Sequence, residues 1–375
     1  MSIIRLSCIK DTIYAPHSNG DLDPAAYNRR RLRGRMDKLV EPRIAPASAL
    51  FRHYLQSKVR RAAVDLPAAQ PPLVMVHGFL FDPKQAVTPD PGDTDNPHGR
   101  MYHFKDTGER NEQRHHTTGW PLWMGYEEAD QTGASGLAIA FGWHSQPGFA
   151  SSLINRFQNF YARAYEVAGT TAWVLVNVLD ELAKTVPGRR IDIMAHSLGA
   201  RVVVRALALA AKHHPDLTER INRVIFLGGA EYVVEAQLMY RRLHDLDRAQ
   251  RPEIYNIVSR ENDVLDKLGE NFGPRTFGNS QVIGHNGLDM SDRAAKNVPN
   301  WIDLQIDSEP LQEWMLNEHN IEVSGDRPGN IWDHWYYYTF RGNLELYRGI
   351  FRDRPQWNIA TLREAKVPEG VSRRW

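Results

Sequence analysis

The sequence predicts an α/β protein in which a mostly parallel sheet is flanked by helices. Short apolar runs bounded by polar segments recur along the chain, as expected of parallel strands that are buried on both faces. Segments with a helical spacing of apolar residues alternate with these runs, which is typical of a sheet wound by helices. One run, residues 191–195, also passes directly into a helical pattern across a single serine, Ser197.

The elements follow one another in the order that such a sheet requires. Each expected strand is a run rich in Ile, Val, Leu or Phe, and each expected helix repeats apolar residues every three to four positions. Pro187-Gly188 ends the longest helical pattern, and Pro215 follows the end of the next one. The expected strands cover about 3–9, 71–78, 137–143, 191–195, 223–230, 253–259 and 301–306, and the expected helices about 47–61, 153–184, 200–210, 233–246 and 343–350.

The segment Ala195-His-Ser197-Leu-Gly199 is the most informative in the chain. A strand that breaks into a helix over one serine forms a nucleophile elbow. The sharp turn strains the serine backbone and requires tiny residues two positions to either side, here Ala195 and Gly199. Alanine stands where the usual pattern has glycine, which keeps the steric requirement. The geometry lifts the Ser197 hydroxyl above the sheet.

A second motif lies upstream, where the apolar run 71–78 ends in His77-Gly78. With both motifs in this order, the chain resembles the α/β-hydrolase superfamily of serine hydrolases, including its esterases and lipases. The resemblance implies an oxyanion hole built from the backbone N–H groups of Phe79 and Leu198. His77 is expected to support this loop rather than to react.

The resemblance also implies a catalytic triad in the chain order serine, acid, histidine. Asp263 follows the expected strand 253–259 and is the predicted acid. Glu231, which lies one strand earlier, is the alternative, because some lipases carry the acid there.

Three histidines follow Asp263, and one of them is the predicted base. His334 lies on a loop between aromatic residues, before the closing helix, and suits this role best. His285 precedes the last strand and His319 is expected to end a helix, but both stay open as alternatives. His196 is excluded because its side chain should point away from that of its neighbour Ser197.

Residues 81–135 form a long insertion directly after the expected oxyanion loop. Long irregular segments in compact proteins are commonly functional, so we expect a lid over the site, with a surface excursion or a dimer contact as the alternatives. Trp120 and Trp123 in the insertion, and Trp332 and Trp335 beside His334, favour an apolar acyl or aromatic substrate. A purely structural role for these tryptophans is the alternative.

Composition sets the remaining expectations. The 375 residues fit a single domain, 1–375, in which residues 1–70 are an N-terminal extension. A net charge of +1 gives no reason to expect nucleic acid as a partner. The lone Cys8 excludes an internal disulfide. No signal peptide or membrane span is evident, so we expect a cytoplasmic protein; the sequence says nothing about its oligomeric state.

These observations predict a serine hydrolase that cleaves small or lipid-like carboxylic esters through an acyl-enzyme. Ser197, His334 and Asp263 are the expected triad, and no metal or cofactor is expected. Amide or thioester cleavage and acyl transfer on the same triad are alternatives within the fold. The alternative outside catalysis is a binding protein that keeps the hydrolase fold.

Overall fold

The computed structural model describes fifteen stretches of the chain. They are residues 3–9, 12–14, 49–63, 70–83, 95–105, 109–110, 115–116, 119–127, 135–146, 156–247, 251–262, 281–289, 298–325, 334–353 and 355–372.

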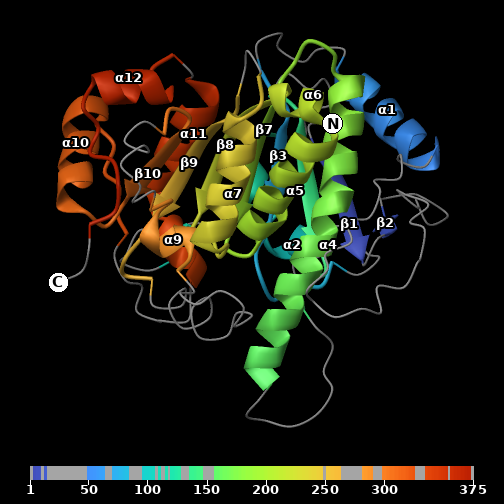
Figure 1. Ribbon diagram of the computed structural model, residues 1–375, viewed down its shortest axis with the longest axis horizontal. Coiled ribbons are helices and arrows are strands. Elements are labelled where there is room, and N and C mark those ends of the chain that lie inside the picture. Colours follow the sequence, from blue (N-terminus) through green and yellow to red (C-terminus); the bar gives the residue numbers. More distant parts are fainter. Residues whose placement is uncertain are drawn as a thin grey trace.

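An eight-stranded sheet in the order β10-β9-β8-β7-β3-β6-β1-β2 forms the centre of the molecule (Figure 1). Every neighbouring pair runs parallel except β1 and β2, which pair antiparallel at one edge. The predicted mostly parallel sheet is therefore confirmed. The strands are β1 (Ile3–Ile9), β2 (Thr12–Tyr14), β3 (Leu73–Val76), β6 (Ala138–Trp143), β7 (Ile191–His196), β8 (Ile221–Leu227), β9 (Glu253–Val258) and β10 (Trp301–Gln305).

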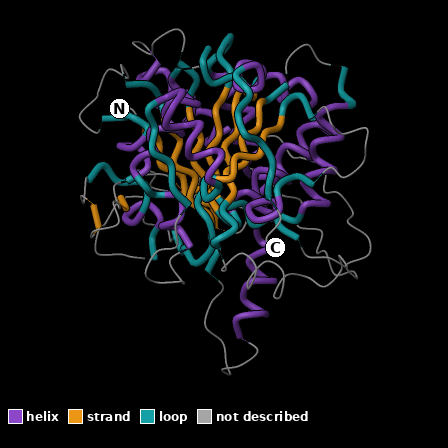
Figure 2. Tube along the Cα trace, turned by 90° about the vertical axis from the view of Figure 1, so that its left-hand side faces the viewer, coloured by secondary structure: helices purple, strands orange, loops and turns teal. Residues whose placement is uncertain are grey.

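Helices cover both faces of this sheet. On one face α4 (Arg156–Thr185) packs on α5 (Gly199–His213), which packs on α7 (Val233–His244); α1 (Ala49–Ala63) and α6 (Pro215–Glu219) contact this layer. On the other face lie α10 (Glu309–His319), α11 (Arg341–Arg352) and α12 (Ile359–Glu364), as well as the 3₁₀ helix η3 (His334–Tyr338). Figure 2 shows the strands between these layers, with the first turns of α4 extending beyond the sheet.

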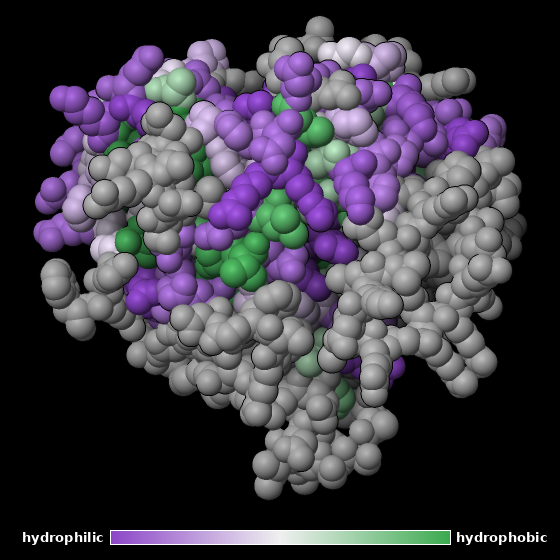
Figure 3. Space-filling view, viewed as in Figure 1, coloured by the Kyte–Doolittle hydropathy of each residue, from purple (hydrophilic) through white to green (hydrophobic). Residues whose placement is uncertain are grey.

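The central strands are apolar because both of their faces are covered. Every residue of β3, β6 and β7 is buried. Burial on both sides removes the need for alternating polar residues, which explains the continuous apolar runs in the sequence. On the side occupied by α5 and α7, Figure 3 shows apolar surface near the middle of the face. Two apolar residues of α7, Val234 and Leu238, are 46% and 40% exposed.

The described parts of the insertion include α2 (Pro97–Arg100) and α3 (Trp120–Trp123), whose neighbourhood packs against the sheet, and a separate small hairpin of β4 (Glu109–Arg110) and β5 (His115–His116). The Tyr102 hydroxyl lies 3.0 Å from the Met75 carbonyl oxygen and 3.2 Å from that of Phe141. Arg352 of α11 donates to the Met124 carbonyl at 2.7 Å. The segment around Tyr102 therefore packs on β3 and β6 near the ends of these strands.

Short elements make up the rest. One turn of helix, α9 (Ile283–Asn286), packs on the loop after β8, where a Cβ on Gly284 would lie 2.4 Å from the backbone of Gly228 and Gly229. None of the helices in the described stretches is both long and apolar enough to cross a bilayer.

The strand order brings the two sequence motifs together. β3 and β7 are parallel neighbours, so the loop after Val76 and the turn at Ser197 leave the sheet at the same edge. The first residue of α5 presses on the end of β3, because a Cβ on Gly199 would lie 2.5 Å from the His77 carbonyl oxygen and 2.6 Å from that of Val76. Glycine at this position is a steric requirement.

Replacing Gly199 by alanine will destabilise the protein. The added methyl group meets backbone atoms of β3 that cannot rotate aside, and overpacking of this kind costs about 1–3 kcal/mol. Urea denaturation measures the change in the free energy of unfolding. Lys212→Ala, an exposed substitution near the other end of α5, is the control and will change it by less than about 0.5 kcal/mol. Equal stability of Gly199→Ala and the control would contradict the steric account.

Candidate active site

Ser197 occupies a strained turn between a buried strand and a helix. Its φ angle is +53°, in the left-handed region that residues with a side chain rarely adopt. The surrounding backbone holds it there: the Ser197 N–H donates to the Leu227 carbonyl at 2.9 Å, and the N–H groups of Ala200 and Ala230 donate to the Ser197 carbonyl. Such strain persists only where neighbouring structure enforces it, and it marks functional sites.

The loop after β3 is held by His77, which is fully buried. The ring donates from Nδ1 to the Gly78 carbonyl at 2.9 Å and accepts at Nε2 from the Trp143 backbone N–H at 2.9 Å. The Trp143 indole N–H donates to the His77 carbonyl at 2.8 Å. Burial lowers the pKa of His77 to about 3, so the ring is neutral and its two nitrogens are both used. These bonds leave His77 as a support of the loop.

This loop lies directly against the serine. A Cβ on Gly78 would be 2.7 Å from the Ser197 Cβ, so only glycine allows the approach. Phe79 follows, partly buried with its ring 5.6 Å from that of Tyr161. Leu80 has a φ of +72° and is 50% exposed, a second strained residue beside the turn.

Leu198 begins the 15-residue helix α5 as its N-cap residue. The positive end of the helix dipole therefore lies at the turn that carries Ser197, and an anion formed there would be stabilised. Phe79 and Leu198, the two predicted oxyanion donors, thus belong to the two loops that meet at Gly78 and Ser197.

His334 comes to this site from the other side of the sheet, on η3. Its ring lies 4.7 Å, centroid to centroid, from the ring of His196, the residue next to Ser197. The Asn262 amide contacts the His334 ring at Nδ1, with Oδ1 at 3.0 Å and Nδ2 at 2.7 Å. The same Nδ2 donates to the Tyr338 hydroxyl at 2.9 Å. The amide nitrogen carries two N–H donors and can serve both Tyr338 and Nδ1, so these contacts fit either ring tautomer. In the tautomer whose Nδ1–H donates to Oδ1, Nε2 keeps its lone pair.

The described surroundings keep His334 neutral. Burial lowers the pKa of His334 to about 3. Its Nε2 is buried and has no hydrogen-bond partner in the described stretches. A neutral imidazole with an unused lone pair can accept a proton, but these neighbours supply no charge that would hold the resulting cation.

The other two candidate histidines have different partners. His285 on α9 contacts Arg260, whose Nη1 lies 3.1 Å from its Nδ1 and 3.0 Å from its carbonyl oxygen. His319 at the end of α10 packs between Trp314 and Trp357, at ring distances of 4.9 and 4.3 Å. Of the three, His334 is the one that contacts the residue beside Ser197.

Glu231, the alternative acid, is part of a buried ion pair on the opposite side of the turn. It accepts from the Tyr165 hydroxyl at 2.6 Å, from the Tyr232 N–H at 2.8 Å and from Arg201 at 3.0 Å. The Arg201 guanidinium in turn lies 3.3 Å from the centre of the Tyr165 ring. The Glu231 carboxylate therefore connects α4, α5 and the loop after β8.

Two predicted residues, Asp263 and Trp332, lie outside the described residues. The sequence did not single out Asn262, although it adjoins Asp263 in the turn after β9. His196 was excluded on the direction of its side chain from the strand, yet its ring contacts both His334 and Trp335, at 4.7 and 4.6 Å. Within the described stretches, no group of three His, Cys, Asp or Glu side chains is placed to hold a metal ion.

A tryptophan cluster borders this site. The Trp335 ring stacks on Trp120 at 5.0 Å and on Trp123 at 5.5 Å, which joins η3 to α3 of the insertion. Three of the four tryptophans that the sequence connected with the site are thus joined through Trp335, which also contacts His196.

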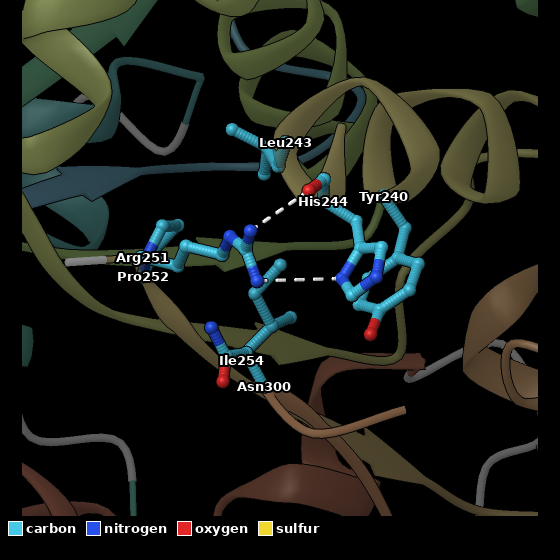
Figure 4. Close-up of a pocket in the computed structure, with 7 residues that line it drawn as sticks. All are labelled: Tyr240, Leu243, His244, Arg251, Pro252, Ile254 and Asn300. Atoms are coloured by element: carbon cyan, nitrogen blue, oxygen red, sulfur yellow. Dashed lines mark hydrogen bonds between the residues drawn. The ribbon is translucent and has the colours of Figure 1, made fainter. Parts of the chain in front are cut away.

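A small pocket at the other end of the sheet is separate from this site (Figure 4). It lies where β9 begins, between Pro252, Ile254 and the end of α7. Arg251 crosses the pocket and donates to the His244 carbonyl at 2.9 Å, so the guanidinium already has a partner. The residues that line it are Tyr240, Leu243, His244, Arg251, Pro252, Ile254 and Asn300.

Comparison with known proteins supports the fold. The family model described as "Alpha/beta hydrolase of unknown function (DUF900)" matches residues 98–265, which include the turn at Ser197. A search of curated proteins gave no match. The crystal structure of a "putative cell surface hydrolase" from Lactobacillus plantarum WCFS1 aligns with 79% of this chain and 96% of its own, at 11% identity and a TM-score of 0.35. Support for an α/β-hydrolase fold therefore comes from the family model and from the strand order.

Replacing Glu231 by glutamine will destabilise the protein. The change leaves the Arg201 charge buried without its partner, and breaking a buried pair costs about 3–5 kcal/mol. Chemical denaturation measures the loss. Glu345→Gln, in the exposed pair with Arg341, is the matched control and will cost less than about 1 kcal/mol. Similar effects for the two variants would contradict a buried ion pair at Glu231.

Proposed function

Because residues 98–265 match an α/β-hydrolase family model and the parallel sheet fits that fold, we propose that the chain is a serine hydrolase that cleaves carboxylic esters through a covalent acyl-enzyme. The observation that supports this most strongly is the backbone of Ser197. A left-handed serine between a buried strand and a long helix projects its hydroxyl to the edge of the sheet, where the Gly78 loop meets it.

In this proposal His334 is the general base. A serine hydroxyl is a weak nucleophile, so it needs a base that takes its proton during attack on the ester carbonyl. The neutral ring and the unpartnered Nε2 of His334 support that role. His334 then returns the proton to the leaving alcohol, and water attacks the Ser197 acyl-enzyme by the same sequence of proton transfers.

The oxyanion of each tetrahedral intermediate is assigned to the N–H groups of Phe79 and Leu198. The support is the contact between their two loops and the N-terminal end of α5. Donors fixed before the reaction stabilise charge without reorganisation, and loss of one typically slows an enzyme about 100- to 1,000-fold.

Asp263 is proposed as the acid that orients His334 and stabilises the imidazolium. The described neighbours of the His334 ring are uncharged, so the negative charge that stabilises the imidazolium has to come from another residue. Asp263 directly follows Asn262, whose amide contacts the ring. Asn262 would then add a second, neutral bond from the same turn. An amide alone orients the histidine in the Cys-His-Asn proteases, which makes Asn262 the rival for this role.

For the substrate we propose an ester with an apolar acyl or aromatic part. The support is the tryptophan cluster around Trp335. Amide or thioester cleavage, acyl transfer to an alcohol, and binding without catalysis are the competing functions. Hydrolysis rates on p-nitrophenyl esters of increasing acyl length, with the matched anilides and thioesters, separate them.

His334→Ala will remove nearly all ester hydrolysis in a folded protein. Loss of a triad member leaves only the oxyanion hole and binding, so kcat will fall by at least about 1,000-fold. His285→Ala and His319→Ala are the controls and will stay within about tenfold of the wild type, the range of a packing disturbance. If one of these controls were inactive and His334→Ala active, the base would be that other histidine.

Asp263→Asn will lower kcat about 10,000-fold, as the same change does in a serine protease triad. It will also move the acid limb of the kcat/KM profile to lower pH. The reason is that a carboxylate favours the protonated ring, so its removal lowers the pKa of His334 and the ring stays neutral further into acid. Asn262→Ala will reduce the rate by about tenfold, the effect of one lost hydrogen bond. A wild-type rate and profile in Asp263→Asn, with a dead Asn262→Ala, would give the orienting role to Asn262.

A further inference from the structure

Four buried nitrogen atoms near Ser197 are not used by the proposed mechanism. They are the indole Nε1 atoms of Trp120 and Trp123 and both ring nitrogens of His196, and none has a hydrogen-bond partner in the described part of the chain. The three side chains are 1%, 6% and 5% exposed. The His334 Nε2 atom also has no partner in the described part of the chain, but the proposed role of base accounts for it.

These atoms belong to a single aromatic group. The Trp335 ring contacts all three side chains: it stacks on the two indoles and meets the His196 ring edge to face at 4.6 Å. The group combines three parts of the chain that are far apart in the sequence, namely α3 of the insertion, η3 and the turn at Ser197.

The group lies beside the reacting serine. His196 adjoins Ser197, and a Cβ on Gly78 would be 3.1 Å from the His196 Nδ1, so this nitrogen faces the loop that meets the serine. Trp120 packs edge to face on Tyr102 at 5.8 Å, and Tyr102 is fixed to the ends of β3 and β6. The indoles are therefore held over the carboxyl edge of the sheet.

Buried nitrogens without partners indicate that a ligand supplies the missing hydrogen bonds. An indole N–H can only donate, a neutral imidazole has one donor and one acceptor, and buried groups of this kind are nearly always hydrogen-bonded in native proteins. A plain alkyl chain cannot satisfy them. An oxygen atom that accepts hydrogen bonds can satisfy the two indole donors and the N–H of His196, and a hydroxyl can also donate to the other His196 nitrogen. The flat rings around it bury the adjoining carbon atoms.

We propose that Trp120, Trp123 and His196 form a donor-lined subsite for an ester that carries an additional acceptor oxygen, such as an ether, carbonyl or hydroxyl oxygen, within a few bonds of the scissile group. The proposal rests on the proposed function, because it places the subsite beside Ser197. It makes this site selective for oxygenated substrates over alkyl chains of the same shape.

Paired amides that differ by one oxygen test the subsite without turnover. The first pair is the 4-nitroanilides of methoxyacetic and butyric acid, and the second is N-(2-methoxyethyl)benzamide and N-butylbenzamide, so that either side of the scissile bond is probed. Calorimetric titration of Ser197→Ala protein gives the Kd of each compound, and the measured quantity is the ratio of Kd values within a pair.

Trp120→Phe and Trp123→Phe keep an aromatic ring and remove the N–H donor. In at least one pair, each change will weaken binding of the methoxy compound about 3- to 10-fold relative to its alkyl partner, as expected for one lost hydrogen bond. His196→Phe will do the same. The control is Trp173→Phe on α4, a buried tryptophan that packs on His213, and it will leave the ratio unchanged.

Unchanged ratios in all three subsite variants would overturn the proposal, and so would equal weakening of both members of each pair, which is the result of lost packing alone. Failure of the proposed function has a different signature. In that case the wild-type protein hydrolyses no ester, while the binding ratios of the Ser197→Ala protein still respond to the three substitutions.

Discussion

The close approach of α5 to the end of β3 is the constraint on which the rest of this site depends. Gly199 lies against the carbonyl groups of Val76 and His77, and Gly78 lies against the Cβ of Ser197, so neither glycine can carry a side chain. The turn that makes this contact forces Ser197 to a φ of +53°, a conformation that costs about 1–3 kcal/mol. Backbone bonds to Leu227, Ala200 and Ala230 hold it there.

Neutral, buried groups keep the surroundings of the serine rigid without adding charge. His77 uses both ring nitrogens to connect the Gly78 loop to Trp143 of β6, and its pKa is lowered so far that it stays neutral. A buried ion pair nearby, Glu231 with Arg201, faces the α4 layer. The side towards η3 carries unpaired nitrogens instead, on which the proposals for the base and for the oxygen subsite depend.

Local sequence predicted those parts of the structure that local geometry determines. The apolar runs gave the strands, and the change of periodicity at Ser197 gave the turn, because a buried strand and an amphipathic helix each leave a periodic pattern. The edge strand β2, the one-turn helices α3 and α9, and η3 are too short for such a pattern, and their positions depend on packing.

Contacts between distant segments could not be predicted in the same way. Exclusion of His196 followed from the alternation of side chains along a strand, but the ring of His334 arrives on the side to which His196 points. Asn262 gave no signal of its own, since its contact with His334 spans 72 positions. The pairing of Glu231 with Arg201 likewise depends on the packing of the loop after β8 against α5.

Reaction with a fluorophosphonate reports directly on whether Ser197 is an activated nucleophile, because only an activated serine displaces fluoride at a useful rate. Mass spectrometry of the digested protein locates the adduct. We expect one adduct on Ser197 in the wild-type protein, none in Ser197→Ala and a strongly slowed reaction in His334→Ala. Folded wild-type protein that stays unlabelled, or that carries the adduct on a different residue, would contradict this expectation.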